Sequence, residues 1–151
     1  MNLQLSRPPA PAVPVRGRLS APQPVAAVLA DRLDDVAVAE TAARIAASRG
    51  VPLLLIAVLP PAPVPGTRAR PDDPEARAVL ARVLPRVPRH HAAHIPAVYR
   101  RPHGRGTRLG AAAGVLALAS HHHAPLVVAS RTGPAGLDAF SLIEAAAIRG
   151  G

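Results

Sequence analysis

The chain has 151 residues, which is enough for one domain with a sizeable buried core. Its apolar content is 49%, mostly small aliphatic side chains, and a single Phe, a single Tyr and no Trp argue against nucleic-acid binding by base stacking. The formal net charge is +9, which favours anionic partners, and the lack of cysteine excludes disulfides, thiolate metal sites and a cysteine nucleophile.

The N-terminus has no apolar segment of the kind found in signal peptides. The longest apolar stretch, residues 109–119, is about half the length that a membrane-spanning helix needs. We therefore expect a cytoplasmic protein with no membrane partner. Residues 1–23 are rich in proline and arginine and have no helical or strand period, so they are predicted to form a disordered tail. The folded domain is expected over residues 24–151.

The first half of this domain alternates between strand-like and helix-like patterns. Residues 25–30 are a short buried-strand candidate. The next segment, 36–49, has an apolar stripe at helical spacing, and Asp34 or Asp35 is placed to cap its first turn. Residues 51–59 are almost all aliphatic, as expected for a central parallel strand that is covered on both faces.

The second half repeats the alternation. Asp73 followed by proline and glutamate predicts a helix start, and residues 95–99 form a weaker strand that an internal proline places at a sheet edge. Thr107 is positioned to cap a third helix, residues 126–129 form a fourth strand, and Asp138 is positioned to cap a fourth helix. Alternating strands and helices predict an α/β fold, in which an open parallel sheet carries helices on both faces.

The segment after the fourth predicted strand is the strongest indication of a binding site. Residues 130–136 form a small, polar, turn-forming loop between that strand and the helix opened by Asp138. At the carboxyl end of a parallel strand, backbone N–H groups and the positive end of the following helix can converge on an anion. We therefore expect any small-molecule function to reside at this loop.

Three segments carry a resemblance to a known family: Val28-Leu-Ala-Asp31, Leu55-Ile-Ala-Val-Leu-Pro-Pro61 and Ala124-Pro-Leu-Val-Val-Ala-Ser-Arg131. Together with the spacing of the elements over residues 24–151, they make the chain similar to the universal stress protein family. The resemblance implies the sheet order 3-2-1-4-5. The chain stops at Gly151, where the fifth strand would begin, so we expect the order 3-2-1-4. An exposed edge on the fourth strand would then be open to a protein partner or a second copy.

The resemblance also implies a pocket for ATP or another adenine nucleotide. In nucleotide-binding members an aspartate ends the first strand and a valine late in the second strand contacts adenine, positions that match Asp31 and Val58 here. The family's phosphate motif, Gly-x2-Gly-x9-Gly-Ser/Thr, is incomplete: Ala129 replaces the first glycine, and Thr132 or Gly133 takes the place of the second. The residues that remain able to contact phosphate are Ser130, Arg131, Thr132, Gly133, Gly136 and Ser141.

These departures leave three outcomes open: tight ATP binding, weak or altered anion binding, or a pocket that serves only as scaffold. In each case we expect a non-enzymatic stress-response or regulatory domain, because no nucleophile, base and carboxylate occur together. His121, His122 and His123 are consecutive and would not converge on one metal ion. The cluster of His90, His91 and His94 is likewise not expected to bind metal.

An alternative function rests on charge. Between Glu75 and Asp138 the chain has no acidic residue, but it has nine arginines, the first being Arg77 and the last Arg131, and all seven histidines. Such a surface could dock an acidic protein or nucleic acid instead of a small molecule.

Overall fold

Four parallel strands form one sheet in a computed structural model that describes residues 23–64, 66–87, 93–104 and 106–150. The order across the sheet is β5-β4-β3-β6, which confirms the predicted order 3-2-1-4. The bounds of the strands are β3 Val25–Leu29, β4 Leu53–Leu59, β5 His94–Arg100 and β6 Leu126–Val128. Residues 1–22 of the predicted tail, and the predicted cluster members His90 and His91, lie outside the described residues.

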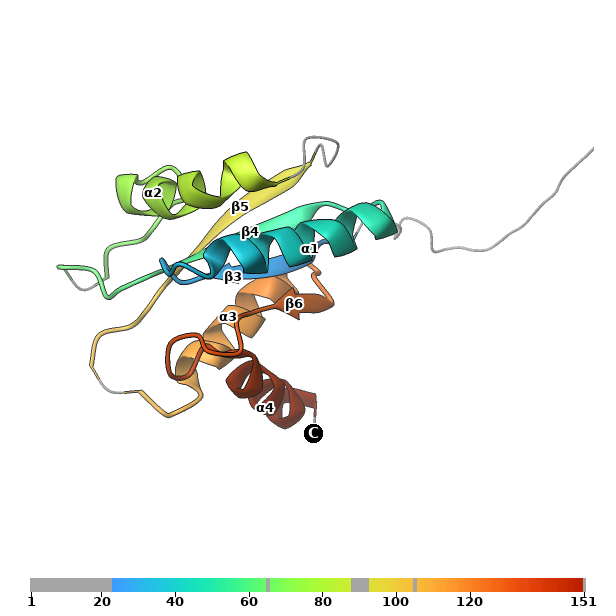
Figure 1. Ribbon diagram of the computed structural model, residues 1–151. Coiled ribbons are helices and arrows are strands. Elements are labelled where there is room, and N and C mark those ends of the chain that lie inside the picture. The colour runs from blue at the N-terminus through green and yellow to red at the C-terminus, as the bar shows by residue number, and fades with distance from the viewer. Residues whose placement is uncertain (1–22, 65, 88–92, 105, 151) are drawn as a thin grey trace, which may run out of the picture.

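Helices cover both faces of this sheet (Figure 1). The first pair, α1 and α2, packs on one face, and α3 and α4 pack on the other. A short 3-10 helix, η2, extends α2. Their bounds are α1 Asp35–Arg49, α2 Pro74–Val83, η2 Leu84–Arg86, α3 Gly110–His121 and α4 Ala139–Gly150. The predicted α/β class with helices on both faces is therefore confirmed.

The hydrophobic core consists of two layers, because alternate residues of the central strands point to opposite faces of the sheet. On β4, Leu53 and Leu55 pack against α1 and α2, while Leu54 and Ile56 pack against α3 and α4. All four side chains are fully buried, and burial of each contributes about 1.5–3 kcal/mol. This two-sided burial explains why the strand is aliphatic throughout and does not alternate with polar residues.

The predicted helix caps agree only in part with the structure. Asp138 caps α4 as predicted, because its carboxylate accepts the N–H of the third helical residue at 3.3 Å. Asp34 and Asp73 occupy the N-cap positions of α1 and α2, but neither side chain makes a capping hydrogen bond. The prediction for Thr107 is wrong: α3 begins at Gly110, whose N–H donates to the Thr107 carbonyl rather than to its hydroxyl.

Both edges of the sheet are formed by strands that have one neighbour each among the described residues. Pro96 lies on the edge strand β5, where its missing N–H is tolerated, as predicted. The other edge strand, β6, pairs only with β3 within the described part of the chain. A partner at that edge stays a prediction. None of the described helices is long and apolar enough to cross a membrane.

Candidate functional site

The loop that follows β3 is held in place by a buried carboxylate. Asp35, only 2% exposed, accepts hydrogen bonds from the backbone N–H of Ala30 at 2.9 Å and of Arg32 at 3.1 Å. Between these two anchored residues, Asp31 adopts a positive φ of 60°. Burial raises the pKa of Asp35, and the two backbone N–H groups oppose that rise. The sequence predicted a cap at this position, whereas the structure uses the carboxylate to fix the loop.

Asp31 and Val58 lie on one cleft at the carboxyl ends of β3 and β4. The cleft has a volume of about 260 Å³, and the loop after β6 closes it with Pro134 and Leu137. The structure therefore brings together the tips of the first, second and fourth strands in sequence order. The carboxylate of Asp31 is paired with the guanidinium of Arg82 on α2, a contact that the sequence did not indicate.

A different carboxylate contacts the predicted phosphate loop. The Ser130 hydroxyl donates to Oδ2 of Asp34, and the Thr132 hydroxyl lies 3.4 Å from the same oxygen. Arg32 supports this arrangement, because it donates to the Thr132 carbonyl at 2.9 Å and lies 3.5 Å from Asp34 Oδ1. The Ser130 hydroxyl, followed by the Arg32 guanidinium, lowers the pKa of Asp34, although partial burial opposes this. An ionised carboxylate thus accepts hydrogen bonds from the hydroxyls that were predicted to contact phosphate.

The other residues predicted to contact phosphate have different surroundings. The Ser141 hydroxyl donates to Asp138 Oδ1 at 2.6 Å, so it serves the cap of α4. Gly136 has φ +86°, and a Cβ there would lie 3.3 Å from the Arg108 carbonyl. The side chain of Arg131 is exposed, and Gly133 is half-buried. The 260 Å³ cleft includes neither Ser130 nor Ser141 in its lining.

Arg101 also belongs to this region, although the sequence placed it only in the basic stretch from Arg77 to Arg131. It follows β5, its backbone N–H donates to the Leu59 carbonyl at 3.0 Å, and it lines the same cleft as Asp31 and Val58. It also lines two further hollows, of about 580 and 200 Å³. Its position in the chain could have indicated this, because a residue directly after a parallel strand lies at the edge of the sheet where ligands usually bind.

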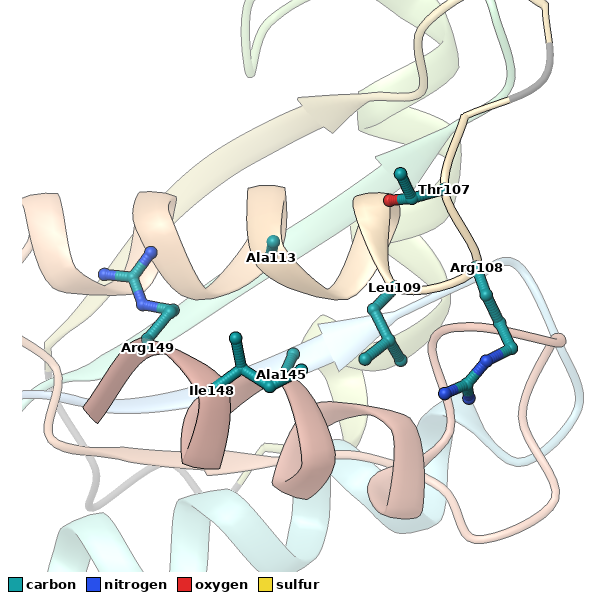
Figure 2. A pocket seen from close by; sticks show the side chains of 7 residues that line it. All are labelled: Thr107, Arg108, Leu109, Ala113, Ala145, Ile148 and Arg149. Atoms are coloured by element: carbon teal, nitrogen blue, oxygen red, sulfur yellow. The ribbon is translucent and has the colours of Figure 1, made fainter. Parts of the chain in front are cut away.

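A separate apolar groove of about 380 Å³ lies between α3 and α4 (Figure 2). Leu109 points into it from the start of α3, and Ile148 points into it from α4. Arg108 and Arg149 stand at opposite ends of the groove. None of the site residues predicted from the sequence lines it.

The predicted basic stretch is partly neutralised by carboxylates from outside it. Arg82, Arg100 and Arg108 pair with Asp31, Glu75 and Glu144, respectively. Burial lowers the pKa of His122, and the neighbouring His121 and His123 act in the same direction. Among the described residues, no group of three metal-binding side chains converges.

The sheet order and the helix layers can be compared with those of solved structures. The chain is similar to the structure of a universal stress protein from Archaeoglobus fulgidus, with 22% sequence identity, a TM-score of 0.50, and coverage of 84% of this chain and 92% of that chain. It has the universal stress protein fold. No protein-family model matches the sequence, and no curated protein matches it at a significant level. The universal stress protein fold is thus established by the arrangement of strands and helices rather than by sequence identity.

Proposed function

We propose that this universal-stress-protein-like domain is a cytoplasmic, non-enzymatic stress-response or regulatory module that binds an adenine nucleotide, or a related anion, weakly. The observation that carries the proposal is the shared cleft of Asp31, Val58 and the loop containing Pro134 and Leu137. In an open parallel sheet, ligands bind outside the carboxyl ends of the strands where the strand order reverses. Here the order reverses between β3 and β6, next to this cleft.

Two features support weak rather than tight binding. The cleft volume of about 260 Å³ is below the roughly 300–1,000 Å³ typical of small-molecule pockets, so the cleft would hold a base more readily than a whole nucleotide. In addition, the hydroxyls of Ser130 and Thr132 already contact the carboxylate of Asp34. A phosphate would have to displace a group of the same charge from these donors.

The proposed lack of enzymatic activity rests on the chemistry of the same contacts. Ser130 has a carboxylate as its hydrogen-bond acceptor, and the lowered pKa of Asp34 makes that carboxylate a weak base. A general base works best when its pKa lies near the working pH. Asp34 is therefore suited to hold the loop rather than to activate the Ser130 hydroxyl.

Isothermal titration of the full chain with ATP, ADP and AMP tests the proposal. We expect dissociation constants of roughly 0.1–1 mM, which corresponds to about 4–5.5 kcal/mol of binding free energy. The variant Pro60→Trp should abolish the signal, because Pro60 is an exposed residue that lines the cleft. The matched control is Pro61→Trp, since Pro61 is also exposed but does not line it. Micromolar affinity for ATP would refute the weak-binding proposal, and no binding of any nucleotide would remove the ligand role.

A second candidate function is docking of an acidic protein or nucleic acid through the basic surface. The observation that favours it is that Arg101 and Arg131 of the stretch from Arg77 to Arg131 have no carboxylate within 4 Å among the described residues, and neither has Arg68, which lies outside that stretch. Arg68 and Arg101 face one hollow of about 580 Å³ together with His103. Salt-dependent retention on heparin would support this function, because neutralised phosphates or sulfates release counterions. Passage through heparin without retention at low salt would contradict it.

A further inference from the structure

Arg101 is the one side chain that borders all three hollows at the carboxyl end of β4 and β5. It is half-buried, and no described carboxylate lies within 4 Å of its guanidinium. The preceding residue differs: Arg100 contacts Glu75 at 3.1 Å and the Pro60 carbonyl at 3.0 Å. Of these two adjacent arginines, Arg100 is held by the fold, and Arg101 has no carboxylate partner among the described residues.

The hollow between β5 and α3 has the shape and chemistry that an oxygen-rich anion needs. Its volume is about 200 Å³, and among the described residues its polar side chains are those of Arg101, Thr107 and Arg108. Most of the rest of the lining consists of residues with no side chain beyond Cβ: Gly104, Gly106, Gly110, Ala111, Ala135 and Gly136. Small residues let a ligand approach the backbone closely, and the positive end of α3 faces the same side.

The two sides of the loop after β6 therefore differ in charge. One side carries Ser130 and Thr132 with the Asp34 carboxylate against them. The other side, through Gly136, borders the hollow that contains Arg101. A phosphate is repelled by the first arrangement and attracted by the second. Arg101 lines both this hollow and the cleft of Val58.

We propose that Arg101 binds the phosphate groups of a di- or triphosphate ligand in the hollow between β5 and α3, with Thr107 as a hydroxyl donor. The site takes polyphosphate chemistry, whether from a nucleotide or from a free polyphosphate. The placement of a base in the Val58 cleft rests on the function proposed above, but the polyphosphate site does not.

The test is isothermal titration of the full chain and of Arg101→Gln with ATP, inorganic tripolyphosphate and adenosine. We expect Arg101→Gln to weaken ATP and tripolyphosphate binding at least tenfold, because a bidentate, charged contact is lost, and to weaken adenosine binding much less, because adenosine carries no phosphate. The matched control is Arg49→Gln, which removes the same charge from an exposed position at the far end of α1. Equal melting temperatures for the two variants would exclude unfolding as the cause.

Several results overturn this proposal. One is undiminished tripolyphosphate binding by Arg101→Gln, and another is no tripolyphosphate binding by the unmodified chain, whatever nucleotides do. Loss of binding in Ser130→Ala, with Arg101→Gln unaffected, would place the phosphates on the loop after β6 instead. The two proposals fail separately: Arg101-dependent binding of tripolyphosphate without any nucleotide binding refutes only the nucleotide function. ATP binding that is indifferent to Arg101 refutes only the polyphosphate site.

Discussion

Substitution of Asp35 tests how the loop after β3 is held in place at the carboxyl end of the sheet. The Asp35 carboxylate is 2% exposed and accepts two backbone hydrogen bonds, at 2.9 and 3.1 Å, from Ala30 and Arg32. A hydrogen bond to a charged group contributes roughly 1.5–3 kcal/mol, and burial of the carboxylate offsets part of the sum. We therefore expect Asp35→Ala to lower the free energy of unfolding by about 3 kcal/mol.

Urea unfolding followed by far-UV circular dichroism would measure this change. Asp35→Asn should lower the free energy of unfolding by about half as much, since its one amide oxygen can accept only part of the hydrogen bonds that the carboxylate accepts. The matched control is Asp72→Ala, at an exposed position for which no side-chain hydrogen bond is found among the described residues, where the change should stay within about 0.5 kcal/mol. If Asp35→Ala unfolded at the same urea concentration as the parent, the reasoning about this loop would be refuted.

The pH dependence of the same variant has a definite sign. Burial raises the pKa of Asp35 above its ordinary value of 3.8, so the folded state holds this proton more tightly than the unfolded state does. The contribution of the group to stability is full below 3.8 and declines as the pH rises through the raised folded-state pKa. The difference in stability between the parent and Asp35→Ala should therefore shrink over that pH window. A difference that grows with pH would contradict the assignment.

Three further predictions concern loops and helices. Asp34→Asn should flatten the loss of stability below pH 3.8, because the Ser130 hydroxyl lowers the pKa of Asp34 and its contribution disappears as the carboxylate is protonated. Acid titration followed by circular dichroism measures this. Gly114→Ala would place a Cβ 2.4 Å from the Tyr99 ring, so we expect urea unfolding to show a loss of about 1–3 kcal/mol. Gly50→Ala, at φ +66° where α1 ends, should lower stability by about 1 kcal/mol in the same assay.

Each of these has an outcome that contradicts it. For Asp34→Asn, the contradicting outcome is unfolding by acid at the same pH as in the parent protein. For Gly114→Ala, parental stability would mean that the Tyr99 ring has room to move. Gly50→Asn is the control for the third variant, because asparagine tolerates the left-handed region better than alanine. Equal losses in the two Gly50 variants would argue against the backbone as the cause.

The repeating pattern of the chain was sufficient to predict the α/β class, whereas the order of the strands was implied by the resemblance to a family. The uninterrupted aliphatic run of β4 indicated a strand buried on both faces, and the structure buries all seven of its residues. Helix α2 begins at Pro74 as predicted, because proline presets the backbone at the first helical position and needs no N–H partner there. Such signals are local, so they can be read without knowledge of the rest of the chain.

The candidate site was predictable in position but not in its contacts. The resemblance to a family implied that Asp31 and Val58 lie in one pocket, and they line one cleft. The roles of Asp34 and Arg101 were not predicted. The sequence predicts Asp34 or Asp35 as a helix cap, yet the Asp34 carboxylate contacts Ser130, which is 96 residues away. Helix caps are recognised by spacing within a few residues, and spacing holds no information about a partner so distant.

The sequence by itself determined which segments become strands and helices, because the period of apolar residues reflects burial on one face or on two. Only the tertiary structure decided which carboxylates neutralise which donors. Asp31, Asp34 and Asp35 lie within five residues, yet they contact Arg82, Ser130 and the backbone of their own loop, respectively. That choice depends on the relative positions of loops joined by parallel crossovers, and local pattern does not encode those positions.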